Sequence, residues 1–89
     1  MEWDAGNSTK SLTKHGFRTT DVEGILDGVV VFAGRIVEPE HEEPRYLMLG
    51  VTHGGRHAAL VFTRRGDELR PISCRAMRKG EREAYDAAT

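Results

Sequence analysis

The spacing of apolar residues changes from a helical to a strand period at Gly28. In the stretch 20–27, three apolar residues recur at the spacing of one helix face. They are Val22, Ile25 and Leu26. Thr20 and Glu23 form a capping-box pattern at the start of the stretch, and Gly28 follows its end. The pattern predicts a short helix over 20–27.

A second helix is expected before it, over about 4–15. Asp4 can cap its start, and Lys14 and His15 occupy a last turn, where cations interact favourably with the helix dipole. Gly16 then provides a natural left-handed stop. The first turns contain poor helix formers, so this helix must depend on tertiary contacts.

Three segments with strand-like alternation follow. They cover about 45–52, 57–63 and 68–76. Gly54-Gly55 and Arg65-Gly66-Asp67 separate them and are short enough for hairpin turns, which predicts an antiparallel meander. Pro71 cannot donate to a strand ladder, so the last strand should lie at an edge or carry a bulge there.

The segments that flank the meander complete the expected fold. Val29–Ala33 is rich in β-branched residues and can either extend the buried edge of the helix or begin a strand. Glu38–Pro44 is a charged loop bounded by prolines, and 78–88 predicts a terminal helix with Arg82 and Asp86 at i,i+4 spacing. We expect an α+β protein in which two N-terminal helices cover one face of a small antiparallel sheet and a C-terminal helix follows.

Alternation along the strands sorts their residues into two faces. The set expected to pack under the helices is Leu47, Leu49, Val51, Leu60, Phe62, Ile72, Cys74 and Ala76. The opposite set is Tyr46, Met48, Val61, Thr63, Ser73 and Arg75. A one-residue bulge at Pro71 would exchange the faces in the last strand. Cys74 is interpreted as a small buried hydrophobe rather than a nucleophile.

Composition limits the class of protein. The chain has 89 residues, of which 38% are apolar and one is cysteine, which predicts a single domain over 1–89 in the reducing cytoplasm. No apolar run reaches the roughly 18 residues of a membrane span. The start, Met1-Glu2-Trp3-Asp4, lacks the apolar core of a secretory signal.

The net charge of −1 conceals two halves of opposite sign. Residues 1–44 carry four basic and nine acidic side chains, whereas 45–89 carry nine basic and five acidic ones. Between 45 and 79, seven arginines and one lysine face only Asp67 and Glu68. Arginine binds phosphate as a bidentate fork and stacks on bases, but these arginines could equally pair with the acidic half.

Two short motifs allow both a structural and a chemical interpretation. Lys14-His15-Gly16 is typical of a helix C-terminus, but His15 also offers a titratable imidazole near a basic surface. Arg78-Lys79 opposes the dipole at the start of the terminal helix and would be favourable if a phosphate bound there. The four histidines and Cys74 lack any zinc-ligand spacing, so we expect no metal site.

The order of several short motifs carries a family resemblance. These motifs are Glu2-Trp3-Asp4, Lys14-His15-Gly16, Arg45-Tyr46 with Leu49-Gly50, Val61-Phe62-Thr63 with Arg65-Gly66, the run from Arg70 to Arg75, and Glu81 with Tyr85. Together they resemble the BrnT family of bacterial type II toxin–antitoxin toxins, which is distantly similar to RelE-type ribonucleases. The run Val29–Glu43 matches least, and no function is assigned to it.

The resemblance implies a β-α-α-β-β-β core followed by a helix, with Trp3 on or beside the first strand. It also implies an endoribonuclease that inhibits translation without a metal or other cofactor. The implied partner is a ribbon-helix-helix antitoxin encoded beside the toxin. Such pairs usually form heterotetramers, and they contact operator DNA only through the antitoxin.

A metal-free ribonuclease directs the ribose 2′-OH at the neighbouring phosphorus. This attack needs a base, a proton donor for the 5′ leaving oxygen, and cations around the developing charge. From the matching motifs, the cationic role falls to Arg75, with Arg64 and Arg70 as neighbours on adjacent strands. Proton transfer falls to His15, or to Tyr85 supported by Glu81. Further RNA contacts are expected from Lys14, Arg45, Arg65, Arg70, Arg78 and Lys79.

Two other classes of function remain open. The chain could be a non-catalytic module whose basic sheet face docks an antitoxin-like partner, with Tyr46, Met48 and Val61 as apolar anchors ringed by arginines. Direct DNA binding is the third hypothesis and is ranked last, because no helix combines basic residues with a helix-turn-helix pattern.

Overall fold

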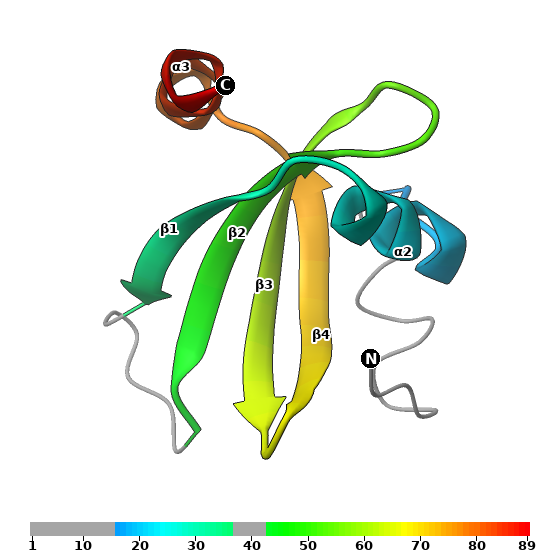
Figure 1. Cartoon of the computed structure of the whole chain (residues 1–89), viewed down its shortest axis with the longest axis vertical. Helices are drawn as coiled ribbons and strands as arrows, with labels where there is room; N and C mark the ends of the chain where they lie inside the picture. The colour runs from blue at the N-terminus through cyan, green and yellow to red at the C-terminus, as the bar shows by residue number, and fades with distance from the viewer. Residues whose placement is uncertain (1–15, 37–42) are drawn as a thin grey trace.

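The computed structural model describes residues 16–36 and 43–89 as two helices and four strands. In chain order these elements are α2 (Thr19–Asp27), β1 (Val31–Ile36), β2 (Arg45–Val51), β3 (His57–Arg65), β4 (Glu68–Ala76) and α3 (Lys79–Ala88). The strands form one sheet in the order β1-β2-β3-β4, with every neighbouring pair antiparallel (Figure 1). No helix in these two stretches is long and apolar enough to cross a membrane.

This architecture confirms the α+β class and the antiparallel meander. The described order of elements is α-β-β-β-β-α, so the expected β-α-α-β-β-β-α arrangement is not matched. The strand at Trp3 and the helix over 4–15 fall outside the described residues. The stretch after Gly28 begins a strand rather than extending the helix, and β1 pairs with β2 along Val31–Ile36.

The predicted boundaries of α2 are close, but its predicted cap is wrong. The N-cap residue is Arg18, whose backbone N–H donates to the Asp21 carboxylate at 2.8 Å. The reciprocal Thr20–Glu23 box does not form, because Thr20 already lies within the first helical turn. An acidic residue in that first turn still complements the helix dipole.

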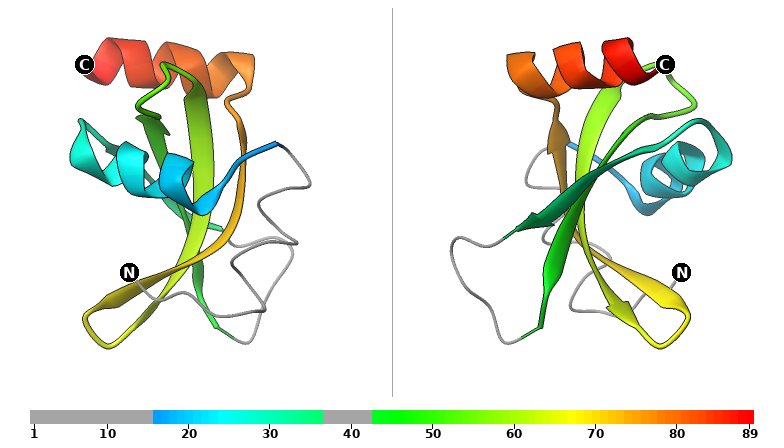
Figure 2. Two further views of the ribbon diagram at one scale, coloured as in Figure 1. Left: turned by 90° about the vertical axis from the view of Figure 1, so that its right-hand side faces the viewer. Right: turned by 60° about the vertical axis from the view of Figure 1, so that its left-hand side comes forward.

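Two apolar clusters lie on opposite faces of the sheet. The α2 face buries Phe17, Val22, Ile25, Ala58, Leu60 and Cys74, with Met48 and Leu69 packed against them. The other face buries Leu49, Ala59 and Tyr85, with Val31, Leu47, Val51 and Met77 against them. Figure 2 shows α2 against one face and α3 across the end of the strands.

The predicted sorting of the faces is therefore wrong for β2. Met48 pairs with Leu60 and Leu49 pairs with Ala59, so Leu47, Leu49 and Val51 lie on the α3 side and not beside Leu60. Because a helix covers part of each face, β2 is apolar on both sides, and alternation alone could not identify which set meets α2. Val61 pairs with Leu47 and therefore lies on the α3 side of the sheet, whereas Tyr46 and Met48 lie on the α2 side. The three residues proposed as apolar anchors thus do not share one surface.

Pro71 lies both on β4, which is an outer strand among those described, and at a bulge. Val61 pairs with Ser73 and Phe62 with Pro71, which leaves Ile72 as an extra residue in β4. The bulge keeps Cys74 and Pro71 on the α2 face although they are three residues apart. Both parts of the expectation for this proline are confirmed.

Candidate functional site

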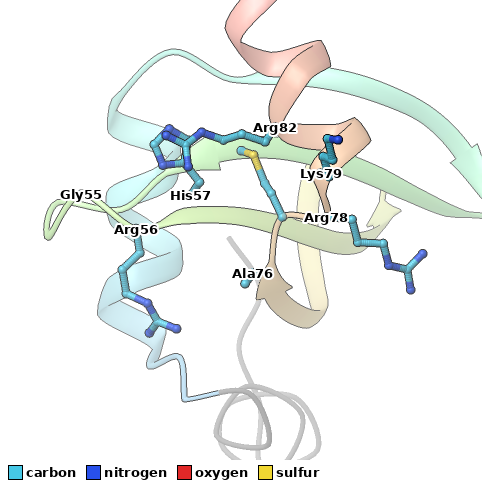
Figure 3. Close-up of a pocket in the computed structure, with 8 residues that line it drawn as sticks. Gly55, Arg56, His57, Ala76, Arg78, Lys79 and Arg82 are labelled. Carbon is cyan, nitrogen blue, oxygen red and sulfur yellow. The ribbon is translucent and has the colours of Figure 1, made fainter.

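A cleft of about 520 Å³ opens at the end of the sheet where α3 begins (Figure 3). Its lining residues come from the turn before β3, the ends of β3 and β4, and the first turn of α3. They are Gly55, Arg56, His57, Ala76, Met77, Arg78, Lys79 and Arg82. Four of these eight side chains are cationic, one is an imidazole, and none is acidic. A cleft lined by charges of one sign concentrates the field and attracts anions.

The guanidinium groups in this cleft point in different directions. In Figure 3 those of Arg56 and Arg78 point away from the His57 ring, whereas the Arg82 side chain extends in its direction. Arg82 also pairs with Asp86 one turn along α3, at 3.6 Å, as the i,i+4 spacing predicted. This exposed pair is weak, so Arg82 can exchange it for a phosphate.

Arg75 and Glu81 fix the start of α3 against the sheet. The two terminal nitrogens of the Arg75 guanidinium, Nη1 and Nη2, donate to the two Glu81 carboxylate oxygens at 2.6 and 2.8 Å. Glu81 also accepts the backbone N–H of Arg78 at 2.8 Å, which caps the helix. The hydrogen bonds from Arg75 hold the pKa of Glu81 below its usual 4.5, and the pKa of Arg75 is raised in turn. This pair therefore determines where Arg78 and Lys79 lie.

Tyr85 is a buried residue that supports the floor of the same region. Its hydroxyl donates to the Val29 carbonyl at 3.1 Å, and its ring meets the His57 ring edge-on at 5.8 Å between centroids. The hydroxyl is thus engaged with the backbone, while the ring orients the imidazole. Contact with His57 places Tyr85 behind the cleft rather than among its lining residues.

Arg56 fastens the chain that enters α2 to the rim of the cleft. Its guanidinium donates to the Gly16 carbonyl at 2.8 Å and stacks 3.8 Å from the centre of the buried Phe17 ring. Gly16 has φ +75°, the left-handed conformation expected there, while the helix that it was expected to end falls outside the described residues. Lys14 and His15 immediately precede Gly16 in the chain but lie outside the described residues.

The remaining arginines of the predicted site lie at the other end of the sheet. Arg64 and Arg65 end β3, Arg45 begins β2, and Arg70 lies near the start of β4. Arg65 is engaged with Glu43 through hydrogen bonds of 2.8 and 3.2 Å, which lower the pKa of Glu43.

The expected convergence of Arg64 and Arg70 on Arg75 is therefore wrong. Arg75 pairs with Ala59, five residues from Arg64 along β3, which corresponds to about 17 Å of strand. Arg64 also pairs with Leu69 and so projects to the α2 face, opposite Arg75. Arg70 shares the face of Arg75 but is five residues away along β4.

Three lining residues were missed from the sequence: Arg56, His57 and Arg82. His57 was considered only as a metal ligand, and its position two residues before Ala59 identifies it as a neighbour of Arg75 only once the register is known. Arg82 was recognisable, because it lies one helical turn after Arg78 and therefore on the same side of α3. Within the described stretches, no group of three His, Cys, Asp or Glu side chains is placed to bind a metal ion.

This arrangement can hold a phosphate among Arg78, Lys79 and Arg82 and can exchange a proton through His57. The sequence also matches a known protein family. A family model described as the ribonuclease toxin BrnT of type II toxin–antitoxin systems matches residues 3–81. No curated protein and no solved structure matches the chain.

Proposed function

The chain belongs to the BrnT family of ribonuclease toxins from type II toxin–antitoxin systems, and we propose that it cleaves RNA at the cleft beside α3 without a metal ion. One observation carries the location: an imidazole, His57, lines a cleft together with Arg78, Lys79 and Arg82. These are the two kinds of group that metal-free phosphodiester cleavage requires, proton transfer and charge stabilisation.

The proposed reaction is an attack by the ribose 2′-OH on the adjacent phosphorus. The 2′-OH gives its proton to one proton-transfer group as its oxygen forms the new P–O bond, and the P–O5′ bond breaks as the 5′ oxygen takes up a proton from the second group. The product ends in a 2′,3′-cyclic phosphate. Lys79 and Arg82 bind the phosphate oxygens, with Arg78 beside them. His57 is one proton-transfer group, and His15 of the Lys14-His15-Gly16 motif is assigned as the second.

The other predicted residues take supporting roles in this proposal. Arg75 and Glu81 position the first turn of α3, and Tyr85 orients His57. Arg45, Arg64, Arg65 and Arg70 contact the RNA backbone at the other end of the sheet, and Lys14 provides a further phosphate contact. The same family membership implies an antitoxin, and we propose a ribbon-helix-helix protein in a heterotetramer.

The experiment is cleavage of an end-labelled single-stranded RNA in the presence of EDTA. Cleavage with a 2′,3′-cyclic phosphate product is expected, and a 2′-deoxy substitution at the cut site should block it. His57→Gln should reduce the rate by about a hundredfold or more, the usual size of a proton-transfer contribution. Lys79→Ala and Arg82→Ala should also reduce it, whereas Arg18→Ala, on the exposed start of α2, is the matched control.

Two outcomes contradict the proposal. If EDTA abolishes cleavage and Mg²⁺ restores it, the reaction depends on a metal. If Arg64→Ala abolishes cleavage while the cleft variants retain it, the active site lies at the other end of the sheet. Expression of the chain alone addresses the non-catalytic alternative, because a pure binding module would bind antitoxin and leave growth unaffected.

A further inference from the structure

An exposed apolar segment joins α2 to the sheet. Among the described residues, the large apolar side chains that are exposed all lie within four positions: Val29, Val30 and Phe32 are 64%, 39% and 62% exposed. Single exposed apolar residues are ordinary on protein surfaces, but a contiguous group marks an interaction site. None of the three lines the cleft.

Phe32 continues a row of aromatic rings that leads into the core. Its ring lies 6.0 Å from that of Tyr46, which lies 5.7 Å from that of the buried Phe62. The row crosses β1, β2 and β3 on the α2 face, and Figure 1 shows that α2 lies away from the β1 side of the sheet. The exposed end of the row is therefore supported by the half-buried Tyr46 and, behind it, the buried Phe62, as an interface anchor should be.

The neighbouring backbone belongs to an outer strand of the described sheet. Among the described strands, β1 pairs with β2 alone, and strands in such a position can pair with a partner segment. The register of β1 shifts between Phe32 and Arg35, and Gly34 in this bulge has φ +99°. The bulge leaves Val31 and Phe32 as the part of the edge that a partner segment can follow.

Two cations flank the aromatic row. Arg35 pairs with Tyr46 in the sheet, and Arg64 lies two residues beyond Phe62, so both project to the same face as the row. Neither makes an ion pair within the described part of the chain. Apolar anchors beside two guanidinium groups match a partner segment with aliphatic and acidic side chains.

We propose that the surface formed by Val29, Val30, Phe32, Arg35 and Tyr46 docks the antitoxin. The antitoxin would place aliphatic side chains against Phe32 and carboxylates beside Arg35. This inference rests on family membership, which implies a protein antitoxin, and not on the location of the cleavage site.

The test compares binding of the cognate antitoxin, encoded beside this chain, to variants of the full-length toxin by isothermal titration calorimetry. Phe32→Ala should weaken binding by about thirtyfold, the size of an interface anchor. Arg35→Glu should also weaken antitoxin binding, and it should reverse the sign of the contribution that residue 35 makes to the salt dependence of that binding. Arg18→Glu, the same charge reversal on α2, should bind as the parent does.

RNA cleavage by the antitoxin-free variants separates this inference from the proposed function. Phe32→Ala and Arg35→Glu should cleave at the parent rate, which also shows that they are folded. Parent-like antitoxin binding by both variants would overturn the docking surface, whatever the cleavage result. A lone chain that is dimeric in solution, becomes monomeric on Phe32→Ala and keeps its antitoxin affinity would instead identify this surface as a homodimer interface.

Discussion

Glu81 shows how one side chain can connect two elements. Its carboxylate receives the Arg75 guanidinium from β4 and the Arg78 N–H from the start of α3, and it is only 17% exposed. A glutamine has the same shape but no charge, so it can accept at most some of these hydrogen bonds from Arg75 and Arg78. The residue identity at 81 therefore controls both helix capping and the position of the cleft cations.

Glu81→Gln should lower the free energy of unfolding by about 1.5–3 kcal/mol at neutral pH, the value of hydrogen bonds to a charged group. Because the folded-state pKa of Glu81 lies below 4.5, its contribution is complete above that pH and is lost as the pH falls through the folded-state pKa. Urea denaturation at several pH values should show the difference from the parent shrinking below about pH 4.5. Glu83→Gln, on the exposed side of the same helix, should show little difference at any pH, and a pH-independent loss for Glu81→Gln would contradict the assignment.

Arg56 is a cleft residue whose guanidinium serves the fold. It stacks on Phe17 and holds the Gly16 carbonyl, so lysine should not replace it although the charge is the same. Arg56→Lys is expected to lower both the melting temperature and the cleavage rate, to nearly the extent of Arg56→Ala. Parent-like cleavage by Arg56→Lys would show instead that only the charge at the cleft is needed.

At the scale of elements, local signals predicted the strands but not their partners. The turns at Gly54-Gly55 and Gly66 correctly placed β2, β3 and β4. Gly55 and Gly66 adopt the positive φ that these turns require, so the signal is contained in a few neighbouring residues. Which face of β2 meets α2 depends on the pairing of Met48 with Leu60, a contact between distant positions. Register of this kind is a tertiary property and cannot be obtained from alternation within one strand.

The contact between α2 and β2 depends on a glycine. A Cβ added at Gly50 would lie 2.5 Å from Cγ2 of Ile25, which is fully buried and β-branched and therefore cannot move aside. Gly50→Ala should destabilise the protein by about 1–3 kcal/mol in thermal unfolding, as overpacking does.

The matched control for Gly50 is Gly80 in the first turn of α3. A Cβ there would meet nothing within 4 Å, and alanine is the better helix former. Gly80→Ala should therefore leave the melting temperature unchanged or raise it. Equal losses for the two substitutions would mean that backbone freedom rather than the Ile25 contact explains the effect at Gly50.

Across the whole molecule, the basic residues of the second half divide between two ends of the sheet. The charge count predicted a basic segment, and the motif order put Arg75, Glu81 and Tyr85 into one candidate site with Glu81 in support of Tyr85. In the structure Glu81 pairs with Arg75 instead, and the Tyr85 hydroxyl donates to the Val29 carbonyl. The motif order did not separate Arg64 and Arg70 from Arg75, because the distance between residues on paired strands follows only when the hairpin length and the register are both known. His57 was missed for the same reason, as its neighbours Tyr85 and Arg82 come from a helix more than twenty positions away in the chain.

Cys74 offers a reporter of global unfolding. It is the only cysteine in the chain and is fully buried between α2 and the sheet, and burial raises the pKa of its thiol to about 12. Because the thiolate is the reactive form, iodoacetamide should modify the protein only through its unfolded state. Alkylation should increase with urea in parallel with the loss of circular dichroism, and rapid stoichiometric modification without urea would contradict this burial.

The salt dependence of RNA binding tests whether the cleft cations act together on the backbone. Each phosphate contact releases a counterion, with a slope of about −0.7 in log K against log salt for single strands, so three contacts predict a slope near −2 from the cleft. Lys79→Ala should weaken the binding of a non-cleavable 2′-deoxy oligonucleotide and reduce the slope by about 0.7. Arg18→Ala should keep the parent slope, since this side chain does not line the cleft. An unchanged slope for Lys79→Ala would mean that RNA follows the arginines at the far end of the sheet and that the cleft binds no phosphate.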